Sequence, residues 1–316
     1  MFLRYIGNIT IFIMNFAITF WILTVFIGAI EVIHPIRWDW LTYLMGKASI
    51  PVTTQSVVIC LSFIATALPA LFSQSVLMKK FILWDEKATL PEPEQTERLT
   101  RIVNNIKEKA GITKKDFRLY IGHIEGSVNA YAITKNEILV TKDLYDTFND
   151  QQLTGILAHE IGHIMHDDVQ NTKLNWAIDV TSSIVLTVIY GIKCLVDMVC
   201  AIPIIGWPFY LISWILSAII FICNWILNLP AVIINRYSSR ENEKNADLFA
   251  CEIGLSDEIY EGIKELTKDE NTVRHEERLY TTHPERKARL KNIEKYIEEH
   301  KAITNPAISQ QNEKTY

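Results

Sequence analysis

Four apolar stretches of membrane-spanning length constrain the fold of this chain more than any other feature of its sequence. A bilayer core offers the backbone no hydrogen-bonding partners, so the roughly 20 apolar residues that cross it must form a helix. The stretches lie at about residues 9–33, 57–78, 176–192 and 209–234. The segments between them are rich in Glu, Lys, Asp and Arg. The sequence therefore predicts a mainly α membrane protein with about four transmembrane helices and a water-soluble part.

Two of these stretches admit another interpretation. The first could be a cleavable signal peptide, but it is long and no small-residue cleavage site follows it, so an uncleaved span is favoured. Residues 176–235 could instead form a large buried helical core. Their length and their Trp, Tyr and Phe content are more typical of membrane helices, with the join between the two spans near residues 193–208.

Basic residues flank the first two spans unevenly. Arg4 precedes the first span and Lys79, Lys80 and Lys87 follow the second, whereas the intervening loop holds only Arg37 and Lys47. Positively charged flanks stay in the cytosol. We therefore expect the N-terminus and the water-soluble segments on the cytosolic face.

Charge and cysteine usage exclude two classes of protein. The formal net charge is −5 and the pI about 5.9, which gives no reason to propose nucleic-acid binding. None of the five cysteines has a C-x-x-C partner, and four lie in apolar stretches. We interpret them as reduced packing residues and not as a disulfide framework.

The water-soluble part carries one metal-binding pattern, His159-Glu160-Ile161-Gly162-His163. Apolar residues repeat around it at helical spacing, and Asn149 and Asp150 precede the run as a helix start. On a helix, histidines four residues apart project from one face, which suits the binding of one Zn²⁺. Glu160 can then hold and deprotonate a metal-bound water. The pattern also arises by chance, so a third ligand and a substrate-binding element are needed elsewhere.

The third ligand is predicted in residues 236–251, a second expected helix. Glu243 and Asp247 lie four residues apart on one face of it. A catalytic two-histidine zinc site lacks a third protein ligand, and a carboxylate can supply it. We assign Glu243 as that ligand and Asp247 as an acceptor that orients a ligand histidine. A solvated charged face is the alternative.

Membrane topology adds a condition to this ligand assignment. If Glu243 joins the two histidines, both segments lie on the same face of the membrane. The apolar insert between them must then cross an even number of times, and two spans satisfy this condition.

These expectations divide the chain into five parts. They are an N-terminal membrane region with two spans (1–80), the first part of a catalytic domain (81–175), a membrane insert with two spans (176–235), the second part of the catalytic domain (236–300) and a flexible tail (301–316). Strands are expected at residues 117–121 and, as a hairpin, at 130–133 and 138–141.

Four motifs follow one another along the chain. They are Asn129-Ala130-Tyr131-Ala132, the His159–His163 pattern, Ser239-Arg240…Glu243…Ala246-Asp247, and Thr282-His283-Pro284…Arg289. With these motifs and its arrangement of spans, most of the chain resembles the HtpX-like membrane zinc proteases, relatives of the CAAX prenyl proteases. One departure is Asn242, where relatives commonly have arginine, and this change alters the local charge pairing without touching the ligand set.

The resemblance implies a cytosolic α+β zincin-like catalytic domain with one Zn²⁺ per chain, bound by His159, His163 and Glu243. Glu160 would take a proton from the attacking water and deliver it to the leaving amine.

The resemblance also implies roles for residues outside the ligand set. Asn129, Ala130, Tyr131 and Ala132 would form the strand edge that receives the substrate. His283 and Arg289 would stabilise the oxyanion, although the Thr-His-Pro turn could instead cap a helix. Asp168 matches a family position too, and we expect it to stabilise a helix end.

The function implied by the resemblance is that of a membrane-bound zinc endopeptidase. Its partners would be the lipid bilayer and polypeptide substrates, such as misfolded or damaged membrane proteins in a stress response, at a plasma (inner) membrane. A protease site within a spanning helix is disfavoured, because polar residues bracket the motif at 149–152 and 166–168. A non-catalytic zinc-binding scaffold or sensor is the other alternative, and the presence of Glu160 argues against it.

Overall fold

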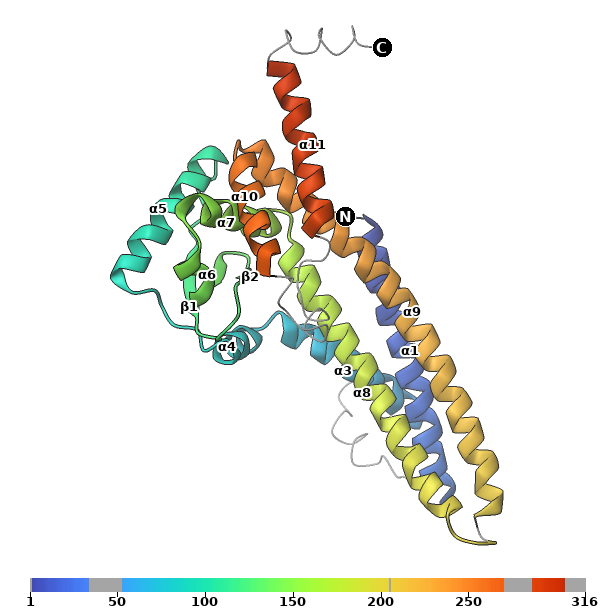
Figure 1. The fold of residues 1–316 in the computed structure, drawn as a ribbon. Helices are drawn as coiled ribbons and strands as arrows, with labels where there is room; N and C mark the ends of the chain where they lie inside the picture. The colour runs from blue at the N-terminus through green and yellow to red at the C-terminus, as the bar shows by residue number, and fades with distance from the viewer. Residues whose placement is uncertain (1, 34–52, 205, 270–285, 305–316) are drawn as a thin grey trace, which may run out of the picture. The chain divides into compact units, whose positions relative to one another are not determined.

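Figure 1 shows the protein as a computed structural model that describes residues 2–33, 53–204, 206–269 and 286–304. The chain divides into two compact units, Met1–Ser75 with Thr172–Arg236, and Val76–Asn171 with Tyr237–Tyr316. Each unit is therefore made from two separate stretches of the sequence.

The first unit is built from long apolar helices. It contains α1 (Phe2–Ile33) and α3 (Thr54–Ser73), most of α8 (Asp168–Cys200) and the N-terminal part of α9 (Trp207–Glu252). Among the described residues, two helical segments are long and apolar enough to cross a membrane, Ile9–Val32 and Thr54–Ser73. They pack against each other, with Phe12 and Phe63 in an edge-to-face contact at 6.4 Å.

The observed helices correct the predicted spans in two respects. The second span was expected to reach residue 78, but α3 ends at Ser73, with Gln74 as its C-cap, and a new helix follows. The join expected near residues 193–208 is shorter, because α8 continues to Cys200 and Lys193 forms an ion pair with Asp197 inside it. α9 runs as one helix from Trp207 to Glu252, and its described apolar segment is Trp207–Ile222. Among the described residues, helices therefore support two of the four expected spans, and the other two stay predictions.

The second unit contains a three-stranded sheet in the order β1-β3-β2. β1 (Arg118–Gly122) runs parallel to β3 (Glu137–Thr141), and β2 (Ala130–Thr134) runs antiparallel to β3. β2 and β3 form the expected hairpin, with a register shift between Ala132 and Thr134. β2 therefore lies at an edge of the sheet.

Side chains of the sheet alternate between two hydrophobic cores, because successive residues of a strand face opposite sides. On one side, Ala130, Ile138 and Val140 join the main core, to which α5 (Pro93–Lys109), α7 (Asp150–Met165) and α10 (Ser256–Asp269) contribute. On the other side, Tyr120, Ile133 and Leu139 pack against α4 (Val76–Asp85). The sheet thus lies between α4 and α7. The remaining helices of this unit are α6 (Lys142–Thr147) and α11 (Arg286–Thr304).

The helix that carries the histidine pattern is the centre of the main core. Its N-cap, Asn149, accepts from the backbone N–H of Gln152, whose side chain accepts from the N–H of Asn149 in return. Residues Leu153–Ile164 of α7 are all buried. The site residues on this helix are therefore held by packing on every side.

Close packing of α7 against α10 leaves no room for a side chain at Gly155. A Cβ atom there would lie 2.2 Å from the carbonyl oxygen of Glu258. We predict that Gly155→Ala lowers the free energy of unfolding by about 3 kcal/mol through overpacking, as measured by thermal unfolding in detergent. The control is Gly191→Ala in α8, where a Cβ would meet no atom within 4 Å. Equal stability of the two variants would contradict this packing.

Candidate metal centre

Helix α7 brings His159, Glu160 and His163 into the interior of the second unit. All three side chains are buried, although each carries an ionisable group. The two histidines are one helical turn apart, so their rings share one face, and their Nε2 atoms lie 3.1 Å apart. Two nitrogen donors therefore converge on one point.

Glu243 of α9 supplies the third donor. One of its carboxylate oxygens lies 3.4 Å from Nε2 of His159 and the other lies 3.4 Å from Nε2 of His163. The three possible ligand atoms lie within 4.8 Å of one another, and the glutamate is buried. The structure thus brings together the three residues that the sequence predicts as zinc ligands, from positions far apart in the chain.

A glycine allows α9 to come this close to α7. A Cβ atom at Gly162 would lie 3.0 Å from Cα of Ala246 and 3.1 Å from its carbonyl oxygen. Ala246 is itself small and fully buried. The small residues at this crossing set the distance between the two helices, and with it the distance from Glu243 to the histidines.

Two aspartates bind the histidine nitrogens that face away from the donor cluster. Asp247 Oδ1 lies 2.8 Å from Nδ1 of His159, and Asp168 Oδ2 lies 3.0 Å from Nδ1 of His163. A carboxylate in this position fixes the ring orientation and leaves Nε2 for a metal. The sequence predicts this arrangement for Asp247. From the sequence we expect Asp168 only to stabilise a helix end. Its position five residues after His163 is the sequence feature that could have indicated the contact with this histidine.

Arg289 of α11 closes the cluster from the side of the carboxylates. Its guanidinium donates to both oxygens of Asp247, at 2.8 and 2.7 Å, and lies 2.9 Å from Oε2 of Glu243. The side chain is buried, and burial of the two carboxylates without a cation would be costly. Arg289 is therefore occupied in holding Glu243 and Asp247.

Glu160 connects α7 to the edge of the sheet. Its Oε2 accepts a hydrogen bond of 3.0 Å from the backbone N–H of Ala132 in β2. The backbone of Asn129 pairs instead with Thr141, so alternate residues of this segment point toward β3 and away from it. Ala130 and Ala132 present their backbone groups at the free edge, and the N–H of Ala130 is bound by the side chain of Asn129.

His283 lies outside the described residues. Tyr131 points to the opposite side of the sheet from Glu160, toward the small core with α4. Burial raises the pKa of its hydroxyl, and the nearby carboxylate of Glu86 adds to that effect.

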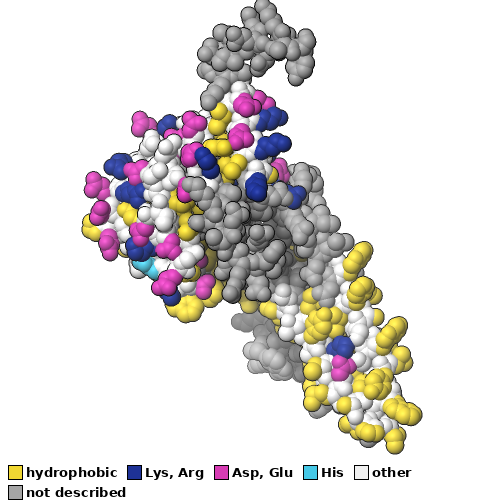
Figure 2. Space-filling view, in the orientation of Figure 1, with side chains coloured by type: hydrophobic (Ala, Val, Ile, Leu, Met, Phe, Trp, Pro, Cys, Tyr) yellow, Lys and Arg dark blue, Asp and Glu magenta, His cyan; other side chains and the backbone are white. Residues whose placement is uncertain are grey.

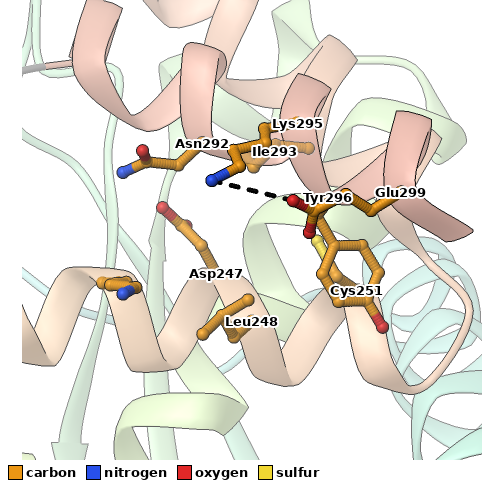
Figure 3. A pocket seen from close by; sticks show the side chains of 9 residues that line it. Asp247, Leu248, Cys251, Asn292, Ile293, Lys295, Tyr296 and Glu299 are labelled. Carbon is orange, nitrogen blue, oxygen red and sulfur yellow. Dashed lines mark ion pairs between the residues drawn. The ribbon is translucent and has the colours of Figure 1, made fainter.

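A cavity of about 270 Å³ lies beside Asp247, between α9 and α11 (Figure 3). Leu248, Cys251, Ile293 and Tyr296 line it, together with Lys295, which pairs with Glu299 at 3.6 Å. Burial raises the pKa of the Cys251 thiol to about 11, so that this cysteine is a neutral packing group. None of the three clustered donors lines the cavity.

The local field of the cluster determines the protonation of its groups in the absence of a metal. Burial alone would lower the pKa of His163, but hydrogen bonds to Asp168 and Glu243 raise it to about 10. Burial alone would raise the pKa of Asp247, but Arg289 and His159 hold it below its usual range. At neutral pH the metal-free cluster therefore carries a proton on His163.

Comparison with known proteins places this sequence in a family. A family model described as Peptidase family M48 matches residues 93–297, which are 205 of the 316 residues. Protease HtpX homolog 1 of Sulfolobus acidocaldarius is 44% identical over 57 residues, which cover 17% of this chain and 18% of that protein. Protease HtpX homolog of Bacteroides fragilis is 30% identical over 83 residues, or 25% of each. The chain thus spans a quarter or less of the length of these curated relatives.

The raised pKa of His163 predicts proton release when a divalent metal binds. In the unfolded chain its pKa is about 6.5, so protonated His163 stabilises the metal-free fold fully below that pH, and this contribution is lost as the pH rises through about 10. A metal must displace the proton, so its apparent affinity should rise at least tenfold per pH unit between pH 6.5 and 8.5. Titration calorimetry with Zn²⁺ in buffers of different ionisation enthalpy should report at least one proton released, because the pKa of His159 is raised as well. Buffer-independent heats would contradict this assignment.

Proposed function

Because this chain belongs to peptidase family M48, we propose that it is a membrane-bound zinc endopeptidase that hydrolyses peptide bonds of polypeptide substrates. One observation carries the proposal. Two histidines and a glutamate from separate helices converge at a buried point, beside a second glutamate that is hydrogen-bonded to a free strand edge.

The donor set fits a catalytic zinc ion. Two imidazole nitrogens and one carboxylate oxygen are ligands that zinc accepts, and three protein ligands leave one position for water or substrate. A zinc ion held there would act as a Lewis acid and lower the pKa of a bound water to about 7. Asp247 and Asp168 hold the two rings, and Arg289 offsets the negative charge that the carboxylates bring into the interior.

Glu160 is the proposed general base and acid. It adjoins the ligand His159 in sequence, and its carboxylate is kept in place by Ala132. It takes the proton of the attacking water and passes it to the amine that leaves. Zinc binding alone would not require this residue, so its presence favours an enzyme over a scaffold or sensor.

The free edge of β2 is the proposed substrate-binding element. A peptide in extended form can pair with the outward backbone groups of Ala130 and Ala132 as an added strand, and in doing so it replaces the bonds that their N–H groups make to Asn129 and Glu160. Main-chain pairing of this kind accepts many sequences, because the backbone groups are common to all peptides. It also places the peptide next to Glu160, which already binds this edge.

The oxyanion has two predicted stabilising residues. The contacts of Arg289 with Glu243 and Asp247 support a positioning role, because they occupy its guanidinium. We retain His283 as the proposed oxyanion donor.

The proposed membrane setting rests on the apolar helices of the chain and on the basic residues that flank them. Two apolar helices and the basic residues after the second span support a catalytic unit at the cytosolic face of a plasma (inner) membrane. A site in that place suits the cleavage of misfolded or damaged membrane proteins, and this is the substrate class that we propose.

We predict that Glu160→Gln abolishes hydrolysis and leaves zinc binding intact. The glutamine keeps the size of the side chain and an oxygen acceptor but cannot take a proton. The measurement pairs zinc content per chain with cleavage of casein by the purified full chain in detergent. Glu108→Gln, an exposed change on α5, is the matched control and should leave both quantities unchanged.

The alternative outcomes separate the competing functions. Full zinc content in all three proteins with cleavage lost only in Glu160→Gln supports the proposal. Cleavage that survives in Glu160→Gln would refute the role of this residue. Stoichiometric zinc without cleavage of casein or of an unfolded membrane protein would support the scaffold or sensor.

A further inference from the structure

Helix α4 presents an apolar face that the second unit does not cover. Leu77, Phe81 and Trp84 follow the spacing i, i+4, i+7 and therefore share one side of the helix. Their exposed fractions are 62%, 49% and 74%. The rings of Phe81 and Trp84 lie 6.1 Å apart, so the two aromatic residues form one continuous patch. Figure 2 shows hydrophobic side chains at the edge of the unit where Figure 1 places α4.

The opposite face of α4 fixes this orientation. Met78 is buried, and Ile82 and Leu83 pack against Tyr120, Ile133 and Leu139 of the sheet. Lys79 donates a hydrogen bond to the buried carboxylate of Glu137 in β3. Burial alone would raise the pKa of Glu137, but hydrogen bonds from Lys79 and Thr134 lower it, so the pair is charged at neutral pH. The helix is therefore attached rigidly, with its apolar face turned outward.

Cations border the apolar face. Lys80 lies on the same side as Trp84, four residues earlier, and Lys87 follows the end of the helix, and both are exposed. One exposed acid, Asp85, stands at the border of the face. Aromatic and aliphatic residues on one side of a helix with lysines beside them are typical of helices that lie in a membrane interface.

The short connection between α3 and α4 is enough to place the start of α4 near the membrane. α3, one of the two apolar helices of spanning length, ends at Ser73, and α4 begins at Val76. Three peptide units extend at most about 11 Å, so α4 starts within that distance of the end of α3. A ten-residue helix is about 15 Å long and about 10 Å wide. One side of it therefore offers much less than the about 800 Å² that each partner buries in a stable protein interface. A lipid surface needs no such minimum area.

We propose that the outward face of α4 lies in the interface of the lipid bilayer, with Leu77, Phe81 and Trp84 at the boundary of the acyl chains and Lys80 and Lys87 among the phosphates. The sheet then rests on a membrane-bound helix. Because α4 and α7 cover opposite faces of the sheet and α4 contacts β2, the free edge of β2 is held close to α4. If the proposed peptidase function holds, its substrate is an extended segment immediately next to the membrane.

Spin labels on single cysteines test the placement of α4 directly. The full chain, with its five native cysteines replaced, is labelled at Phe81→Cys or Trp84→Cys and reconstituted in vesicles of phosphatidylcholine with phosphatidylglycerol. Asn104→Cys, an exposed position on α5, is the control. We expect labels 81 and 84 to be more accessible to oxygen than to a water-soluble nickel complex, and label 104 to show the reverse order.

Each other result overturns the proposal in a recognisable way. Labels 81 and 84 that are more accessible to the nickel complex would place α4 in water. Labels that neither reagent reaches would show that protein covers this face, either a second copy or another part of the chain. The accessibility of the labels to oxygen and to the nickel complex does not depend on zinc or on peptidase activity. A failure of the proposed function therefore does not affect this test.

A variant separates membrane contact from catalysis. Phe81→Ser combined with Trp84→Ser should leave cleavage of soluble casein unchanged and lower cleavage of a membrane-anchored substrate at least several-fold, because β2 is no longer held at the surface. Thermal unfolding of the same variant in detergent should be unchanged, since both side chains are exposed. Equal loss on both substrates would count against the proposal.

Discussion

The approach of α9 to α7 is the contact on which the candidate site depends. Glu243 is 80 residues beyond His163 in the sequence, and the apolar insert lies between them. Local spacing cannot bring these residues together, so the helices must cross at short distance, and Gly162 against Ala246 permits this. A larger side chain at either position would move Glu243 by the few tenths of an ångström to which a metal site is sensitive. The crossing therefore converts two motifs into one site.

The electrostatic design of the site follows from that crossing. Four carboxylates, of Glu160, Asp168, Glu243 and Asp247, are brought into a buried region, and each has a specific polar contact there. Arg289 neutralises part of the charge from α11, and the two aspartates fix the rings of the histidines. Buried charges are tolerated when they are paired and hydrogen-bonded. The cluster is therefore prepared for a divalent ion, which would neutralise the remaining negative charge.

Features set by local spacing were predictable from the sequence. The two histidines on one face of α7, the Glu243–Asp247 pair and the β2–β3 hairpin each follow from helical or strand periodicity. Asp168 lies in the first turn of α8, at a helix end as expected, but its contact with His163 was not predicted, because that contact depends on the left-handed turn at Asp167, φ 58°, between α7 and α8. The same limit applies to the Ala132–Glu160 hydrogen bond, which requires the packing of α7 on the sheet. The break of the second apolar stretch at Gln74 was missed because apolar residues resume directly after the polar triplet Ser73-Gln74-Ser75.

The central claim is that His159, His163 and Glu243 hold one zinc ion. X-ray absorption at the zinc edge, on the zinc-loaded full chain and on Glu243→Ala, tests it most directly. For the wild type we predict two imidazole ligands, additional oxygen ligands and no sulfur. For the variant we predict the loss of one protein ligand and weaker zinc binding. A zinc environment that is identical in the two proteins, or one that contains sulfur, would contradict the assignment.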